Sequence, residues 1–115
     1  MTNKLKKSAP HTLDEAFEVV CQEMETIFIK KHTDYGKGNI LANKELGIAM
    51  RVSEKVERLK HLLLTSQDPA NESVEDTWMD IGVYAIIAVM YKKGWFEKLE
   101  MSNPQNLPNK TQKSI

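Results

Sequence analysis

The sequence predicts an all-α fold, a bundle of three long helices with a short helical turn near its end. Apolar residues recur at helical spacing in three long segments, and strand-like alternation of useful length is absent from the sequence. A length of 115 residues with 41% hydrophobic and 28% charged residues suits one globular domain. We expect a flexible segment at 1–11, the helical domain at 12–101 and a disordered tail at 102–115, where apolar residues are too few to order the chain.

The first helix is predicted from about residue 13 to about residue 31. Thr12 followed by Glu15 forms a capping-box signature, and apolar residues with helical spacing come after it. Cys21 lies on this apolar stripe, so we expect it to be a small buried hydrophobic residue. Because the chain has 1 cysteine, an internal disulfide is excluded, which fits a reducing cytoplasm.

The second helix is predicted from about residue 44 to about residue 65, after a loop at 32–40. Two glycines and several turn-forming residues indicate the loop, which is also rich in groups able to contact a ligand. The helix has apolar residues on one face, which we expect to be buried. They are Ile48, Val52, Val56, Leu59 and Leu63.

The third helix is predicted to end at Gly94, a residue suited to the left-handed conformation that follows many helices. Residues 66–70 break the preceding helix, and Asn71 or Ser73 can cap the new one. Beyond Gly94, a short helical turn is expected to fold back onto the core through four apolar residues. These are Trp95, Phe96, Leu99 and Met101.

Apolar residues cover more than one side of the third helix, which is more than a small three-helix layer can bury. We therefore expect a homodimer, or a homotetramer formed as a dimer of dimers, built around this helix. The alternative cover is a fourth short helix formed by the region around Trp95. One side of the third helix carries Trp78, Ile81, Ala85 and Val89, and the other carries Val83, Ile87 and Met90.

The charges of the chain cancel. With 16 basic and 16 acidic residues, the molecule as a whole offers no general attraction for nucleic acid or an anionic membrane. The lysines near the N-terminus are not followed by an apolar stretch, so no secretory signal is expected. The apolar run at 81–91 is well short of the roughly 20 residues that a membrane span needs. We therefore expect a soluble cytoplasmic protein.

Asp80 is the most informative residue of the chain, because it lies inside an apolar run of the third helix. A carboxylate in such a position needs a cation, a metal or a hydrogen-bond donor to offset the loss of water. Two interpretations follow: a metal site, or a buried ion pair with Arg51 or Arg58. Asp76 lies one helical turn earlier.

Four carboxylates suggest a magnesium site. Glu54 and Glu57 lie on one side of the second helix, and Asp76 and Asp80 lie on one side of the third. Magnesium binds through a few carboxylates and leaves its other positions to water and substrate phosphates. Glu54 or Glu57 would also orient or deprotonate an attacking water. The alternatives are that Glu54 and Glu57 are exposed helical charges and that Asp76 is a helix-start residue behind Ser73.

Three segments together resemble the MazG-like family, and in particular the nucleotide modification associated domain type 1, found largely in phages and mobile elements. They are Lys31 to Gly36 with Asn39 and Ile40, Arg51 to Lys60, and Asp76 to Asp80 with Tyr84. The similarity covers about residues 13–96 and implies an all-α fold that holds magnesium or manganese on helical acids. It also implies hydrolysis of a nucleoside triphosphate, including deoxynucleotides (dNTP), to the monophosphate and pyrophosphate. Glu54 and Glu57 match the Glu-x-x-Glu half of the family pattern, whereas Thr77 stands where the second half has its first acid, so Asp76 takes that role.

Basic and loop residues complete the expected site. Cationic side chains would hold the phosphates, and the candidates are Lys31, Arg51, Lys55 and Arg58. Lys55 and Arg58 have an alternative interpretation as solvated helix-face residues. Base and sugar recognition is expected from Asp34, Tyr35, Gly36 and Asn39, with Tyr84 from the shared motif. Tyr35 and Gly36 alternatively form a turn that packs on the first helix. His32 and His61 do not belong to a group of histidines and cysteines with the spacing of a zinc site.

The expected activity is therefore a magnesium-dependent nucleoside triphosphate pyrophosphohydrolase, in nucleotide-pool cleaning or phage-type nucleotide modification. The chain has no phosphate-cradling Gly-x-x-x-x-Gly-Lys loop. A non-catalytic helical dimer that acts as a nucleotide-binding or protein-interaction module is the alternative. Nucleic-acid binding is a third class, carried by two basic clusters. These are Lys30 with Lys31, and Lys55 with Arg58 and Lys60.

Overall fold

A computed structural model describes residues 9–65 and 73–102, and every regular element in these two ranges is a helix. The predicted all-α class is therefore confirmed. Residues 1–8, 66–72 and 103–115 lie outside the described parts, and with them lie the cap predicted at Asn71 and most of the predicted tail. The helices are α2 (Leu13–Tyr35), α3 (Gly38–Thr65), α4 (Val74–Lys92) and the short α5 (Trp95–Lys98).

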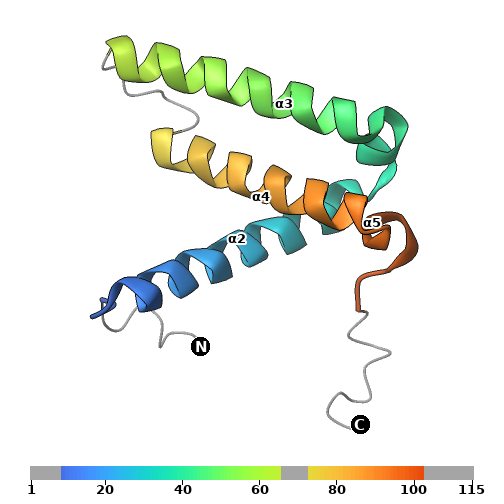
Figure 1. Cartoon of the computed structure of the whole chain (residues 1–115), viewed down its shortest axis with the longest axis horizontal. Coiled ribbons are helices and arrows are strands. Elements are labelled where there is room, and N and C mark those ends of the chain that lie inside the picture. The colour runs from blue at the N-terminus through green and yellow to red at the C-terminus, as the bar shows by residue number, and fades with distance from the viewer. Residues whose placement is uncertain (1–8, 66–72, 103–115) are drawn as a thin grey trace, which may run out of the picture.

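The helices meet at one end of the molecule. α3 and α4 lie side by side and run in opposite directions, while α2 crosses beneath α4 (Figure 1). At this crossing a Cβ atom on Gly82 would lie 2.8 Å from the Met24 sulfur, so the absent side chain allows the close approach of the two helices. The core gathers where α2 ends, α3 begins and α4 joins α5, and its buried residues are Ile48, Val83, Ile87 and Phe96.

The helix ends follow the expected local chemistry. The Thr12 hydroxyl accepts a hydrogen bond from the Glu15 amide at 3.3 Å, and the Ser73 hydroxyl accepts from the Asp76 amide at 2.9 Å. Gly94 has a φ of 78° and turns the chain from α4 into α5. The short helical turn predicted after Gly94 is present as α5 and brings Phe96 into the core. The expected burial of Trp95, Leu99 and Met101 is wrong, since all three are exposed.

The loop predicted at 32–40 is wrong over most of its length. α2 continues to Tyr35, and Gly36, with a φ of 71°, ends it by donating its amide to the His32 carbonyl at 2.8 Å. α3 already begins at Gly38, so the connection consists of Gly36 and Lys37 alone. A break in helical geometry at Lys44, with a φ of 59°, separates a first short piece of α3 from the long piece that was predicted.

The face that α3 buries is rotated from the predicted one. Ile48 and Leu59 are buried as expected, but Leu62 takes the place of Leu63, which is 58% exposed. Val56 is also exposed. Positions 48, 55, 59 and 62 share one helical face, so Lys55 lies on the buried side of α3 and reaches Asp80 on α4.

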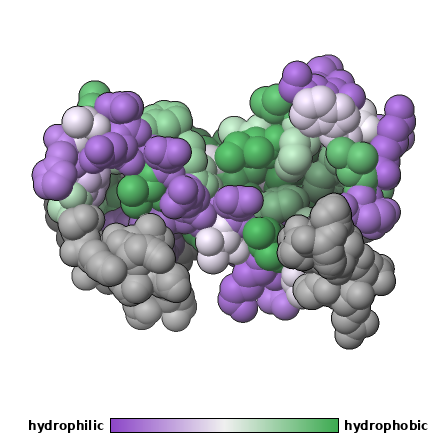
Figure 2. Space-filling view, turned by 90° about the horizontal axis from the view of Figure 1, so that it is seen from below, coloured by the Kyte–Doolittle hydropathy of each residue, from purple (hydrophilic) through white to green (hydrophobic). Residues whose placement is uncertain are grey.

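More large hydrophobic side chains are exposed than buried among the described residues. The first half of α2 projects beyond the other helices (Figure 1), which leaves Phe17 72% exposed and leaves Cys21 exposed, so the predicted burial of Cys21 is wrong. Hydrophobic surface also gathers near the middle of the face shown in Figure 2. Trp78, predicted to lie in the core or an interface, is 55% exposed in the single chain. Within 9–65 and 73–102, no helix is long and apolar enough to cross a membrane.

Candidate ligand-binding site

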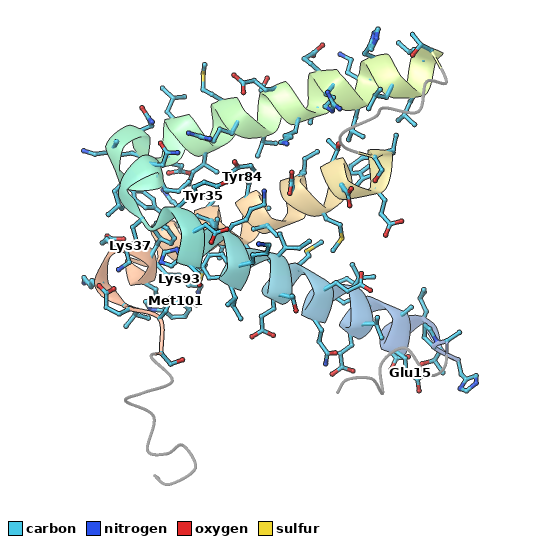
Figure 3. The ribbon with its side chains drawn as sticks, turned by 180° about the vertical axis from the view of Figure 1, so that it is seen from behind. Glu15, Tyr35, Lys37, Tyr84, Lys93 and Met101 are labelled. Atoms are coloured by element: carbon cyan, nitrogen blue, oxygen red, sulfur yellow. The ribbon has the colours of Figure 1, made fainter. Side chains whose placement is uncertain are left out.

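A pocket of about 290 Å³ opens where α2, α3, α4 and α5 come together. Tyr35 and Tyr84, which come from α2 and α4, both line it and lie near each other in the view of Figure 3. The lining combines aromatic, aliphatic, cationic and acidic groups. Its residues are Phe28, Lys31, His32, Tyr35, Gly36, Asn39, Ile40, Arg51, Asp80, Val83, Tyr84, Ile87 and Phe96.

Helical spacing explains which side chains reach the pocket. Four lining residues on α2 and four on α4 each follow the pattern i, i+3, i+4, i+7, so each set occupies one face of its helix. Because α2 crosses α4, these two faces meet. The remaining walls come from Gly36 after α2, Asn39 and Ile40 at the start of α3, Arg51 from its long part and Phe96 from α5. On α2 the four residues are Phe28, Lys31, His32 and Tyr35, and on α4 they are Asp80, Val83, Tyr84 and Ile87.

The pocket brings together most of the predicted substrate-binding residues. Six of them line it, together with Asp80, although they come from three separate segments of the sequence. Three do not line it. Asp34 is exposed and pairs with Lys30 at 3.7 Å, Arg58 lies half-buried further along α3, and Lys55 contacts Asp80 from outside the lining. The six lining residues are Lys31, Tyr35, Gly36, Asn39, Arg51 and Tyr84.

Asp80 has a cationic partner within the chain. Its carboxylate lies 3.0 Å from the Lys55 ammonium, and the two side chains are 16% and 26% exposed. The sequence predicted that a cation, a metal or a hydrogen-bond donor lies against this carboxylate, and in the structure that group is a cation. The cation is Lys55 and not the predicted Arg51 or Arg58, and the interpretation of Lys55 as a solvated residue is wrong, since its side chain is 26% exposed and paired.

The other three predicted metal ligands lie apart from the pocket. Asp76 is exposed in the first turn of α4, where its amide bonds to Ser73, as the helix-start interpretation expects. Glu54 is exposed, and Glu57 is exposed and pairs with Lys60 at 3.3 Å. In the described parts of the chain, no group of three or more histidine, cysteine, aspartate or glutamate side chains is gathered to hold a metal. Within the described residues, the four predicted acids therefore do not form a preformed magnesium site.

His32 belongs to the pocket although the sequence offered no function for it. Its ring stacks on Phe28 with centroids 5.4 Å apart and meets Phe96 edge-on at 6.0 Å. The spacing of four residues between Phe28 and His32 could have indicated that the two rings contact each other, but only if the helix had been predicted to extend past Lys31. Phe96 was likewise expected only as a core residue, and Val83 and Ile87 only as apolar residues of the third helix.

The electrostatic balance of the pocket favours an anionic ligand. Lys31 and Arg51 contribute two positive charges to the lining, whereas the charge of Asp80 is matched by Lys55 from outside it. Aromatic rings beside cations provide stacking surface and anion contacts in one place. A comparison with known proteins adds no relative, since no family model, no curated protein and no solved structure matches the chain.

Proposed function

We propose that the protein binds a nucleoside triphosphate in this pocket and hydrolyses it to the monophosphate and pyrophosphate. The observation that carries the proposal is the joint lining of one pocket by two cations and several aromatic rings. A nucleotide needs both, because its phosphates are anionic and its base is a flat aromatic group. The sequence resemblance to MazG-like proteins supports the reaction class.

Each group has a distinct part in the proposed complex. Lys31 and Arg51 hold phosphate oxygens, and the planar guanidinium of Arg51 suits two parallel hydrogen bonds. Tyr35 and Tyr84 supply stacking surface for the base. The Asn39 amide offers both a donor and an acceptor to the sugar or base.

The proposed reaction is an attack of water on the α-phosphorus. A new bond joins the water oxygen to that phosphorus while its bond to the α–β bridging oxygen breaks, so pyrophosphate leaves with the bridging oxygen. Asp80 lines the pocket and supplies the acceptor that orients the water and takes its proton. No step is assigned to magnesium or manganese, because the four acids predicted to hold it do not meet within one chain.

Turnover by two matched variants tests this function. Purified protein would be assayed for pyrophosphate release from a panel of ribonucleoside and deoxynucleoside triphosphates, with and without magnesium. Asp80→Asn should abolish release, whereas Asp76→Asn, a matched change one helical turn away on the same helix, should keep it. Equal activity of Asp80→Asn and the parent would overturn the assignment of Asp80, and loss in both variants would support the four-acid metal site instead.

The Lys55–Asp80 ion pair favours a second candidate, a nucleotide-binding module without turnover. A carboxylate already neutralised at 3.0 Å by a lysine can serve a purely structural role. In that case nucleotides would bind with an affinity that depends on Arg51, and no pyrophosphate would be released with any metal. Binding and turnover assays on the same preparation separate the two candidates.

We also propose that two copies of the chain associate through the outer side of α4 and α5. An apolar groove of about 300 Å³ lies there, lined by Ala85, Ile86, Val89, Met90, Lys93 and Trp95. Ile86, Val89 and Trp95 are exposed in the single chain, and a second copy is the simplest cover for them. Light scattering should give a dimer or tetramer for the parent protein and a smaller species for Val89→Glu. A monomeric parent would refute this part of the proposal.

A further inference from the structure

We propose that His32 reads the base of the bound nucleotide and so determines base preference. The proposal rests on the proposed function and names a residue to which the sequence analysis assigned no role in binding. His32 lines the pocket, is half-buried and belongs to the last turns of α2. Its role follows from how its ring is held and from which groups surround it.

Two aromatic rings fix the His32 imidazole. Phe28 lies against one face of the ring, with an angle of 29° between the planes, and Phe96 meets it at 85°. Phe28 precedes His32 by one helical turn, and Phe96 is only 5% exposed, so both neighbours are themselves held in place. A ring oriented in this way presents its nitrogen-bearing edge in a defined direction.

The ring nitrogens of His32 are available to a ligand. No hydrogen bond or ion pair joins the His32 side chain to another of the residues described, and its nitrogens are not among the buried polar atoms that lack a partner. They therefore keep contact with solvent, and His32 is one of the residues that line the pocket. A neutral imidazole has one donor and one acceptor, which suits hydrogen bonding to the edge of a base.

The pocket has a buried apolar side and an exposed cationic side, and His32 lies on the buried side, where we place the base rather than the phosphates. Val83, Ile87 and Phe96 are buried core residues and form the inner wall of the pocket, and His32 contacts Phe96. Lys31 is exposed and lies at the rim of the pocket. A flat apolar base fits the inner wall, whereas phosphates stay near the solvent-exposed Lys31.

The test compares His32→Phe with Arg51→Met across ligands that differ in base and in phosphate number. Equilibrium dialysis would measure the affinity of the full chain for the four nucleosides and their triphosphates. His32→Phe keeps the aromatic packing and removes both ring nitrogens, so affinity for the preferred base should fall about 5- to 15-fold, equally for nucleoside and triphosphate. Preference among bases should flatten. Arg51→Met should weaken the triphosphates alone.

A rescue variant and a stability control complete the design. His32→Gln restores a donor and an acceptor and should recover part of the base preference, while melting curves should show that His32→Phe folds as stably as the parent. Unchanged base preference in His32→Phe, with nucleotides still bound, would overturn the role of His32. A loss that grows with phosphate number would place His32 at the phosphates and also overturn it. No nucleotide binding by the parent would instead overturn the proposed function.

Discussion

The Lys55–Asp80 ion pair should contribute measurably to the stability of the fold. At the observed separation of 3.0 Å, an effective dielectric constant of about 20 gives a gross attraction of about 5 kcal/mol. Most of this is offset by the loss of water, and both side chains keep some solvent contact, with exposures of 16% and 26%. We expect a net coupling energy of about 1–2 kcal/mol.

A double-mutant cycle measures this coupling. Lys55→Met leaves Asp80 half-buried without its cation and should cost about 2 kcal/mol, whereas Asp80→Asn should cost less, because the long lysine can extend toward water. The free energy of unfolding would be taken from urea denaturation followed by circular dichroism at 25 °C, for both single variants and the double variant. The slope against urea should stay unchanged, which shows that the unfolded state is not altered.

The exposed pair of Glu57 and Lys60 provides the matched control. Its two side chains are 69% and 61% exposed and 3.3 Å apart, so its coupling in the cycle Glu57→Gln and Lys60→Met should stay below about 0.5 kcal/mol. If the coupling of Lys55 with Asp80 were no larger than that of the control pair, the partial burial that we assign to this ion pair would have no energetic consequence. The reasoning would then be refuted.

Three further changes test other parts of the fold and the pocket. Ser73→Ala removes the cap of α4 and should lower the free energy of unfolding by about 1 kcal/mol, and an unchanged urea midpoint would show that the cap is dispensable. Gly36→Ala places a side chain at a φ of 71° and should lower the free energy of unfolding by about 1 kcal/mol. The cost comes from backbone strain alone, since no atom lies within 4 Å of the new Cβ. A stabilised variant would contradict the left-handed geometry. Phe96→Ala should cost about 3–5 kcal/mol and abolish nucleotide binding, whereas a variant that binds nucleotides normally would exclude α5 from the pocket.

Local sequence signals predicted those helix ends that depend on a single residue. Thr12, Ser73 and Gly94 each satisfy or redirect the backbone within a few residues, and such interactions depend little on the rest of the fold. The region after Lys31 was harder. Gly36 does end a helix, as predicted, but Gly38 begins α3, and the polar residues before Gly36 continue α2, where His32 stacks on Phe28.

The rotation of α3 depended on contacts that a hydrophobic pattern does not contain. Val56 and Leu63 fit an apolar stripe as well as Leu62 does, but in the structure Leu62 is buried and Lys55 faces Asp80. Identifying Asp80 as a carboxylate that needs a partner was possible from sequence, because its neighbours are apolar. Identifying the partner was not possible, since Lys55 is 25 residues away and its charge alone predicts solvent exposure.

The sequence predicted many of the residues that line the pocket, but it did not predict how the acidic residues are arranged. The motif residues around Tyr35, Arg51 and Tyr84 do share one pocket, because α2, α3 and α4 converge at one end of the molecule. The four predicted acids do not share one place in a single chain, since equal spacing on two helices does not fix which faces meet. Metal dependence of turnover therefore stays a prediction for the assay described above.

Mapping the bound nucleotide onto the chain tests the central claim most directly. Amide resonances of isotope-labelled protein would be followed by nuclear magnetic resonance during titration with a non-hydrolysable nucleoside triphosphate. We expect the largest shifts at Phe28, His32, Asn39, Arg51 and Tyr84, with small shifts at Ile86 and Val89 in the apolar groove on the other side of α4. No shifts at all, or shifts centred on the groove, would contradict the assignment of this pocket as a nucleotide site.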